Sequence, residues 1–144
     1  MADAAGDTDI DAALFARLAA DPLAGHLGIT LEQVRPGYAR ASMPVGPRLL
    51  NTVGTAHGGA TMALLDVVHA AVSNSHGTVA VAQDVHTEFL SPGAEGDVLV
   101  AEGVEVHRSS RTAVYRIEAR AQDGRMVATA LARVFRTGRP WSEL

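Results

Sequence analysis

The chain of 144 residues contains no cysteine and no lysine, since all twelve of its basic residues are arginine. The first absence excludes a disulfide scaffold, a thiolate zinc site and a cysteine nucleophile. The second excludes Schiff-base chemistry on lysine and a P-loop, whose motif requires that residue. Among the common hydrolytic groups, carboxylates, histidines and backbone amides are left.

Aromatic and charged side chains are also scarce, at 4% and 19% of the residues. The few aromatics argue against a stacking surface for single-stranded nucleic acid, and a net charge of −4 disfavours any nucleic-acid partner. Apolar residues make up 47% of the chain, which argues against disorder and provides for a core. We expect one domain over residues 1–144, with a core at about residues 22–137 and with residues 1–7 disordered.

Features of membrane and secreted proteins are missing as well. No run of about 18 apolar residues is available to cross a membrane. Residues 1–7 are acidic, whereas a secretory signal begins with basic residues. The expected location is therefore the cytoplasm, with no membrane partner.

Residue patterning predicts one short helix, one long helix and about six strands. The short helix begins at Thr8 or Asp9 and ends at Asp21-Pro22. Residues 60–73 contain neither glycine nor proline and are apolar on nearly every face, which predicts a buried central helix. Strand-like segments, divided by turn signals, are residues 28–45 (two strands around Pro36-Gly37), 79–90, 98–107, 113–122 and 126–136.

This order of elements predicts an α+β domain in which an antiparallel sheet of about six strands wraps around the long helix. The hairpin signal Asp123-Gly124 near the end of the chain argues against a doubly wound sheet. A sheet that is buried on one face only leaves an edge to protect, which favours a dimer that continues the sheet.

Asp66 is the one formal charge between Arg48 and Asp84, and it lies in the middle of the apolar helix. Burying an isolated carboxylate is costly, so such a residue is paired, hydrogen-bonded or partly neutralised. A satisfied structural acid and a functional carboxylate are both open, and the apolar flanks favour function.

His57, Gly58 and Gly59 stand at the predicted start of this helix. Free amides and the positive end of the helix dipole could stabilise a carbonyl oxygen as it gains negative charge, although a tight turn is the plainer reading. Asn51, ahead of this turn, could hold a water or a carbonyl, or could simply shape the loop.

Spacing constrains how these residues could cooperate. Nine residues separate His57 from Asp66, which places them on opposite sides of one helix with roughly 13 Å of rise between them. If both are functional, each site combines the helix start of one subunit with Asp66 of another, and a two-fold dimer carries two such sites. His69 lies on the same face as Asp66 and could orient it, or could be a core or interface residue.

The loop Arg108-Ser109-Ser110-Arg111 brings two guanidinium groups and two hydroxyls to one hairpin tip. Such a set suits phosphate, and a solvated loop is the alternative.

The ordered set of Asn51, His57-Gly58-Gly59 and Asp66 resembles the hotdog-fold acyl-CoA thioesterases. It is most similar to their phenylacetate-degradation (PaaI-like) branch, and the resemblance covers about residues 22–137. Further stretches that carry it are residues 73–77, Phe89–Gly93 and Gly96-Asp97.

The resemblance implies a hotdog fold, dimers with a continuous sheet, and a homotetramer. It also implies hydrolysis of a phenylacetyl-type acyl-CoA, with no metal and no cofactor beyond the coenzyme A of the substrate. Asp66 would be the general base or nucleophile, while the Gly58 amide and His57 would polarise the thioester carbonyl. Asn51 would position water or the thioester, and residues 108–111 would contact the nucleotide part of coenzyme A.

Two features depart from the pattern of the family. Ala82 and Gln83 stand where some relatives have a serine or threonine near the attacking water, and Gln83 could substitute for it. His69 stands where an apolar or aromatic residue is expected. An acyl-CoA hydratase or dehydratase of the hotdog type and a non-catalytic acyl-CoA binder remain as alternatives.

Overall fold

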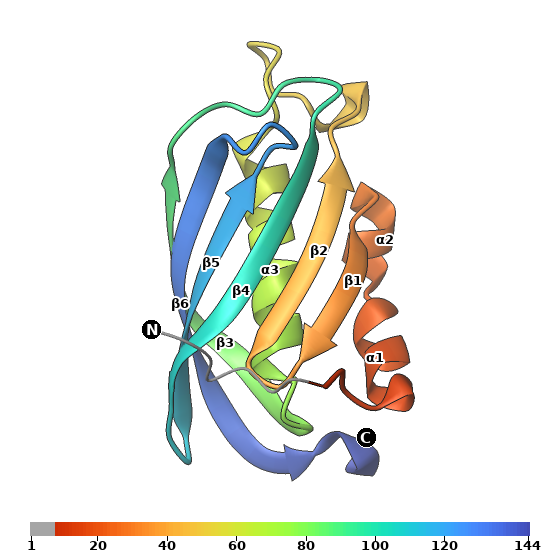
Figure 1. Ribbon diagram of the computed structural model, residues 1–144, viewed down its shortest axis with the longest axis vertical. Helices are drawn as coiled ribbons and strands as arrows, with labels where there is room; N and C mark the ends of the chain where they lie inside the picture. Colours follow the sequence, from red (N-terminus) through yellow and green to blue (C-terminus); the bar gives the residue numbers. More distant parts are fainter. Residues whose placement is uncertain (1–7) are drawn as a thin grey trace.

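The computed structural model describes residues 8–144, in which a six-stranded sheet curves around one long helix (Figure 1). The predicted disorder of residues 1–7 lies outside the described residues. The helices are α1 (Ala12–Ala19), α2 (Pro22–Leu27), α3 (Gly58–Ser73) and the short 3-10 turns η1 (Pro47–Leu49) and η2 (Trp141–Glu143). The strands are β1 (Thr30–Arg35), β2 (Tyr38–Pro44), β3 (Thr78–Phe89), β4 (Val98–Arg108), β5 (Thr112–Arg120) and β6 (Met126–Pro140).

All six strands pair antiparallel in the order β1-β2-β4-β5-β6-β3. The predicted α+β architecture and number of strands are therefore confirmed. Strand β3 lies at one edge of the sheet and, within residues 8–144, pairs with β6 alone. This 12-residue strand leaves one long row of backbone groups open at the sheet edge.

Helix α3 begins two residues before the predicted start because His57 caps it. The Nδ1 atom of His57 accepts a hydrogen bond from the Gly59 amide at 2.9 Å. The helix ends at Ser73, and Asn74 caps its C-terminus. The Nδ2 atom of Asn74 donates a hydrogen bond to the Ala70 carbonyl at 2.8 Å. The Oδ1 of Asn74 also accepts from the Ala80 amide at 2.8 Å, which ties the helix end to β3.

One stripe of α3 stays exposed, although most of the helix is buried against the sheet. The stripe consists of Gly59, Met62, Asp66 and Ala70, which the helical period places in one row. The prediction that Asp66 is buried is wrong within one chain, because its side chain is 63% exposed. The sheet covers only one side of the helix. The lack of other charges near Asp66 indicates an apolar helix, but it does not indicate whether Asp66 lies on the covered or the open side.

The N-terminal segment forms two helices in place of the single predicted one. Asp11 caps α1 by accepting from the Ala13 amide at 2.7 Å, so the predicted cap at Thr8 or Asp9 is wrong. Asp21-Pro22 ends the first helix as predicted but also starts α2, because Asp21 accepts from the Ala24 amide at 3.0 Å. Proline suits the first helical turn, where no amide donor is needed.

None of the helices within residues 8–144 is long and apolar enough to cross a membrane.

Gly103 in β4 allows α3 to approach the sheet closely. A Cβ atom at this position would lie 2.8 Å from Cγ1 of Val68 on the helix. We expect Gly103→Ala to lower the free energy of unfolding by about 1–3 kcal/mol, because overpacking forces the helix and sheet apart. Chemical denaturation measures this change. Gly25→Ala is the matched control, since Gly25 is helical with nothing near its Cβ position, and an equal loss there would contradict the explanation.

A buried polar cluster stands beside the C-terminal end of α3. Its centre is Glu105 in β4, whose side chain is only 7% exposed. Glu105 pairs with His76 at 2.8 Å and with Arg108 at 3.3 Å, and it accepts a longer hydrogen bond from Tyr115. Burial alone would raise the pKa of Glu105, but the hydrogen bond and charge of His76, together with Arg108, bring it below its ordinary value. Burial also raises the pKa of Tyr115, which the Glu105 charge raises further.

The direction of the Glu105 shift predicts a pH-dependent stability. Because the pKa is lower in the folded protein than its ordinary value of 4.5, the stabilisation is complete above pH 4.5. It is lost as the pH falls through the folded-state pKa. We expect Glu105→Gln to cost about 1–3 kcal/mol of unfolding free energy at neutral pH and progressively less in acid. Urea denaturation over a pH series checks this, with half-exposed Glu118→Gln as control. A difference in stability between Glu105→Gln and wild type that stays constant with pH would refute it.

Candidate active site

A cleft of about 390 Å³ opens at the N-terminus of α3, between the loop before the helix and the segment that follows β3. Both Asn51 and Gly58, two of the predicted site residues, line it. The full lining is Asn51, Thr55, Ala56, Gly58, Thr61, Phe89, Leu90, Ser91, Pro92, Gly93 and Val127.

The amide of Gly58 is the free donor at this helix start. The amides of Ala60 and Thr61 donate to the His57 carbonyl at 3.0 and 3.1 Å, and the Gly59 amide donates to the His57 side chain. Within residues 8–144, the Gly58 amide has no acceptor. A free N–H at the positive end of a 16-residue helix suits an oxygen that carries or gains negative charge.

The side chain of His57 serves the helix itself. Its Nδ1 accepts from the Gly59 amide, so the proton of the neutral ring sits on Nε2. His57 is exposed and is not part of the cleft lining. Within one chain, its contribution to the site is to begin the helix at Gly58, a residue of the cleft lining.

Asn51 holds the loop that forms one wall of the cleft. Its Oδ1 accepts from the amides of Val53 and Thr55, both at 3.1 Å, and its Nδ2 donates to the Thr55 hydroxyl at 2.9 Å. The sequence left open a structural or a functional role for this residue. The geometry supports the structural role and leaves one Nδ2 hydrogen for a ligand.

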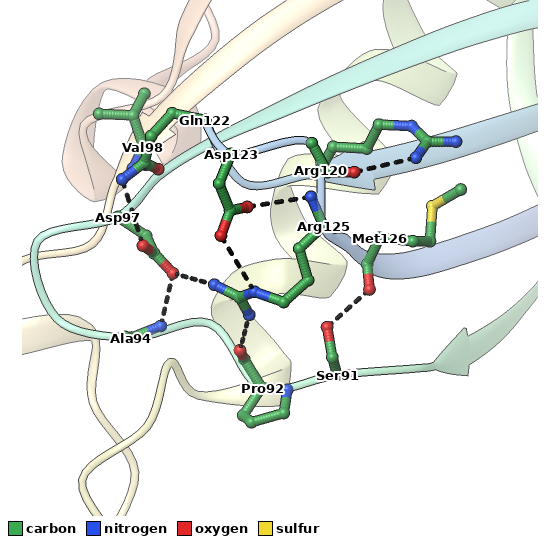
Figure 2. A network of polar contacts seen from close by, with 11 residues as sticks. Ser91, Pro92, Ala94, Asp97, Val98, Arg120, Gln122, Asp123, Arg125 and Met126 are labelled. Carbon is green, nitrogen blue, oxygen red and sulfur yellow. Dashed lines mark hydrogen bonds and ion pairs between the residues drawn. The ribbon is translucent and has the colours of Figure 1, made fainter.

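The opposite wall is held by a polar network (Figure 2). Asp97 pairs with Arg125 at 2.9 Å, and Arg125 also donates to the carbonyl of Pro92, a residue of the cleft lining. The hydrogen bond from the Ala94 amide, together with Arg125, lowers the pKa of the Asp97 carboxyl below its usual value. The next carbonyl, that of Gly93, accepts from the amide of Ala56 at 2.8 Å, which joins this wall to the loop before α3.

Sequence reasoning missed Arg125. The sequence places Arg125 directly after the turn Asp123-Gly124. When β4, β5 and β6 pair, this turn lies beside the loop between β3 and β4, and that position was the available sign of a role for Arg125. Asp97 was noted only as part of the family resemblance.

Asp66 does not reach the cleft of its own chain. It is not among the lining residues, and nine residues of helix separate it from His57, about 13 Å of rise. Within one chain, Asp66 is therefore separated from the helix start, as the spacing predicts. Its carboxylate Oδ1 lies 3.8 Å from Nδ1 of His69, which is buried.

The Arg108–Arg111 loop joins β4 to β5 at the end of the molecule opposite to the start of α3 (Figure 1). Two of the four side chains of this loop already have partners within the fold. Arg108 pairs with Glu105, and the Ser109 hydroxyl accepts a hydrogen bond from the Thr112 amide at 3.1 Å. Ser110 and Arg111 are exposed and have no side-chain partner in the described part of the chain.

Gln83 lies at an irregularity in β3, where the pairing with β6 shifts between Ala82 and Asp84. Both Ala82 and Gln83 are exposed on this edge strand. Bulges of this kind redirect a side chain and are common beside active sites. No group of three or more histidine, aspartate or glutamate side chains within residues 8–144 is arranged to hold a metal ion.

Comparison with known proteins identifies the family. The profile of the Thioesterase superfamily matches residues 53–128. Acyl-coenzyme A thioesterase PaaI of Escherichia coli is 36% identical over 118 residues, which are 82% of this chain and 84% of the relative. The solved structure of the E. coli PaaI protein, from the phenylacetic acid degradation operon, matches with a TM-score of 0.84 and 34% identity, over 88% of this chain and 91% of that one.

A second solved structure is that of smu.793 from Streptococcus mutans bound to acetyl CoA. It matches with a TM-score of 0.75 and 30% identity, over 78% of this chain and 90% of that one. These matches confirm the predicted hotdog fold and the predicted class of enzyme, a thioester hydrolase. The chain belongs to the thioesterase superfamily.

Proposed function

We propose that this protein hydrolyses an aromatic, phenylacetyl-type acyl-CoA to the free acid and coenzyme A. The observation that carries the proposal is the amide of Gly58, a free donor at the start of α3 in a residue that lines the cleft. The relative named acyl-coenzyme A thioesterase and the neighbour bound to acetyl CoA support coenzyme A as the thiol component.

In this proposal, Asp66 of one subunit completes the cleft of another. The carboxylate lies on the exposed stripe of α3, too far along the helix to serve its own Gly58. The exposed side chain of Met62 lies on the same stripe, one helical turn earlier, and the edge of β3 is open. An unpaired edge of this length suits a second copy of the chain, joined by a two-fold axis.

A homotetramer would use the outer face of the sheet. Val81, Leu131 and Phe135 are exposed there, on the paired strands β3 and β6. Exposed apolar patches on a sheet face are typical of protein interfaces.

The chemistry assigns one role to each group. Asp66 takes a proton from water, or attacks the carbonyl carbon itself, while the carbonyl oxygen gains negative charge and accepts from the Gly58 amide. The tetrahedral intermediate then collapses, the C–S bond breaks and the thiolate of coenzyme A leaves. If water is the nucleophile, the free acid forms directly; if Asp66 is the nucleophile, a mixed anhydride forms on its carboxylate, and water then hydrolyses it to the free acid. Because a thiolate is a good leaving group, a general acid is not required, which agrees with a site that has one carboxylate.

Phe89 and Leu90 favour an aromatic acyl group. Both line the cleft and are 54% and 57% exposed, so they offer an apolar wall beside the reacting carbonyl. The exposed Ser110 and Arg111 suit the phosphates of the nucleotide part. Asn51 contributes its remaining Nδ2 hydrogen to water or to the thioester.

A screen for release of free thiol tests the proposal. The substrates are phenylacetyl-CoA, a hydroxylated phenylacetyl-CoA, benzoyl-CoA and acetyl- to octanoyl-CoA, each tested over a range of concentrations. We expect release from all of them, with the highest kcat/KM for a phenylacetyl-type thioester. Hydration of an enoyl-CoA without thiol release would favour a hydratase instead, and saturable binding without turnover would favour an acyl-CoA binder.

A further inference from the structure

His69 is a polar residue that is buried in the core, on the side of α3 that faces the sheet. Its side chain is 1% exposed, and its Nε2 atom has no hydrogen-bond partner among residues 8–144. A buried polar atom without a partner destabilises the folded state, because it loses its hydrogen bonds to water.

Packing does not account for the imidazole. The ring lies against Tyr115, with the two centroids 5.7 Å apart and the planes tilted by 57°. The hydroxyl of Tyr115 donates to Glu105, so this contact with His69 is between rings. A phenylalanine would make the same ring contact without an unsatisfied nitrogen.

The other ring nitrogen faces the carboxylate. Nδ1 of His69 lies 3.8 Å from Oδ1 of Asp66, one helical turn earlier on α3. This distance exceeds that of a hydrogen bond by roughly 0.6–1.1 Å, which a small rotation of the Asp66 side chain would close. Asp66 is exposed and has no hydrogen-bond partner in the described chain, so no hydrogen bond has to break for that rotation.

The position of the ring proton follows from these surroundings. A neutral imidazole carries one proton, and Nδ1 is the nitrogen with an acceptor nearby. With the proton on Nδ1, His69 becomes a donor to Asp66 and leaves only a lone pair on the buried Nε2.

We propose that His69 is a positioning residue for Asp66. Its Nδ1–H holds Oδ1 of the carboxylate, so that Oδ2 is directed towards the reacting water or carbonyl in the neighbouring subunit's cleft. The inference rests on the proposed function, since it needs Asp66 to take part in the reaction. A fixed carboxylate starts closer to its reactive geometry, and this benefit offsets the buried nitrogen.

Two substitutions separate positioning from packing. His69→Phe keeps a ring of similar size against Tyr115 and removes both nitrogens. We expect kcat to fall about 10- to 100-fold with KM within about twofold, because orientation affects the reaction and not the binding. The melting temperature should rise by about 2–4 °C, since the unsatisfied nitrogen is gone.

His69→Asn is the conservative variant, because its amide nitrogen stands close to the place of Nδ1. We expect it to recover most of kcat while it lowers the melting temperature, since the smaller side chain leaves a void. His69→Phe with kcat within twofold of wild type would overturn the inference. So would equal losses of kcat in both variants, which would mean that His69 acts through the packing of α3.

The Asp66→Asn background keeps this test distinct from that of the proposed function. In that background, His69→Phe should cause no further loss, because the carboxylate that it positions is gone. If Asp66→Asn retains wild-type turnover, the assignment of Asp66 fails and the inference fails with it. If Asp66→Asn is inactive while His69→Phe is fully active, only the role of His69 fails.

Discussion

Asp66→Asn lowers kcat for thioester hydrolysis by about 10²- to 10⁴-fold, the usual contribution of a general base, and leaves KM nearly unchanged. Asparagine has the shape of aspartate, but it cannot accept the proton of water or attack a carbonyl. Because Asp66 is 63% exposed within the chain, the substitution should not disturb folding. Thiol-release kinetics measure the loss, and circular dichroism with a melting curve checks the fold.

A second carboxylate provides the control for Asp66. Glu102 lies on β4, is 48% exposed and pairs with Arg40 at 3.1 Å, so Glu102→Gln removes the same charge elsewhere. Surface ion pairs contribute little to stability, and we expect wild-type kcat. Near wild-type turnover of Asp66→Asn would show that the catalytic carboxylate lies elsewhere. Equal losses in both variants would point to a general effect of charge.

The long elements were predictable because their signals are local. Residues 60–73 contain no glycine or proline, and α3 covers them all. The turns Pro36-Gly37 and Asp123-Gly124 separate the strands where the sequence places them. Strand ends were less certain: β6 continues to Pro140, four residues beyond the predicted end, because its pairing with β3 extends that far.

The surroundings of Asp66 could not be read from local patterns. An apolar helix needs cover on all sides, but the sequence does not say whether the sheet or another subunit supplies it. The sheet of this chain covers Leu64, Leu65 and Val68 completely and leaves Asp66 open. The rise between His57 and Asp66, in contrast, follows from helix geometry alone and was predictable.

The ion pair that holds one wall of the cleft could not be predicted from the sequence for a related reason. Asp97 and Arg125 are 28 residues apart, and each looks like an ordinary surface residue by itself. Their contact depends on the register of β4, β5 and β6, which the alternation of residues does not determine. Likewise, Asp21-Pro22 was read as a helix end, although the same pair is a good cap and first position for the next helix.

Gly58→Pro tests the amide donor by deleting it. Proline has no N–H, yet it is well tolerated at the first position of a helix, which is the place of Gly58 in α3. The preceding residue also accepts it, since His57 is extended, with φ −62° and ψ 132°. We expect kcat to fall about 10²- to 10³-fold, as when one donor to a developing oxyanion is removed.

Gly58→Ala is the matched control, because it keeps the N–H and adds a carbon atom at the same place. That Cβ would lie 3.3 Å from Cζ of Phe89, the far end of a half-exposed ring that can shift. A small loss for alanine beside a large one for proline would isolate the amide. Comparable losses would mean that bulk near Phe89 blocks the cleft, and full activity of Gly58→Pro would exclude this amide.

Mixing the two inactive proteins then tests whether the sites lie between subunits. Gly58→Pro carries an intact Asp66, and Asp66→Asn carries an intact helix start. In a hybrid dimer, one site receives both substitutions and the other receives neither. If subunits exchange freely at equal amounts, half of the dimers are hybrids with one working site in two, and activity returns to about a quarter of wild type. If Asp66 served the cleft of its own chain, every site would keep one defect and the mixture would stay inactive.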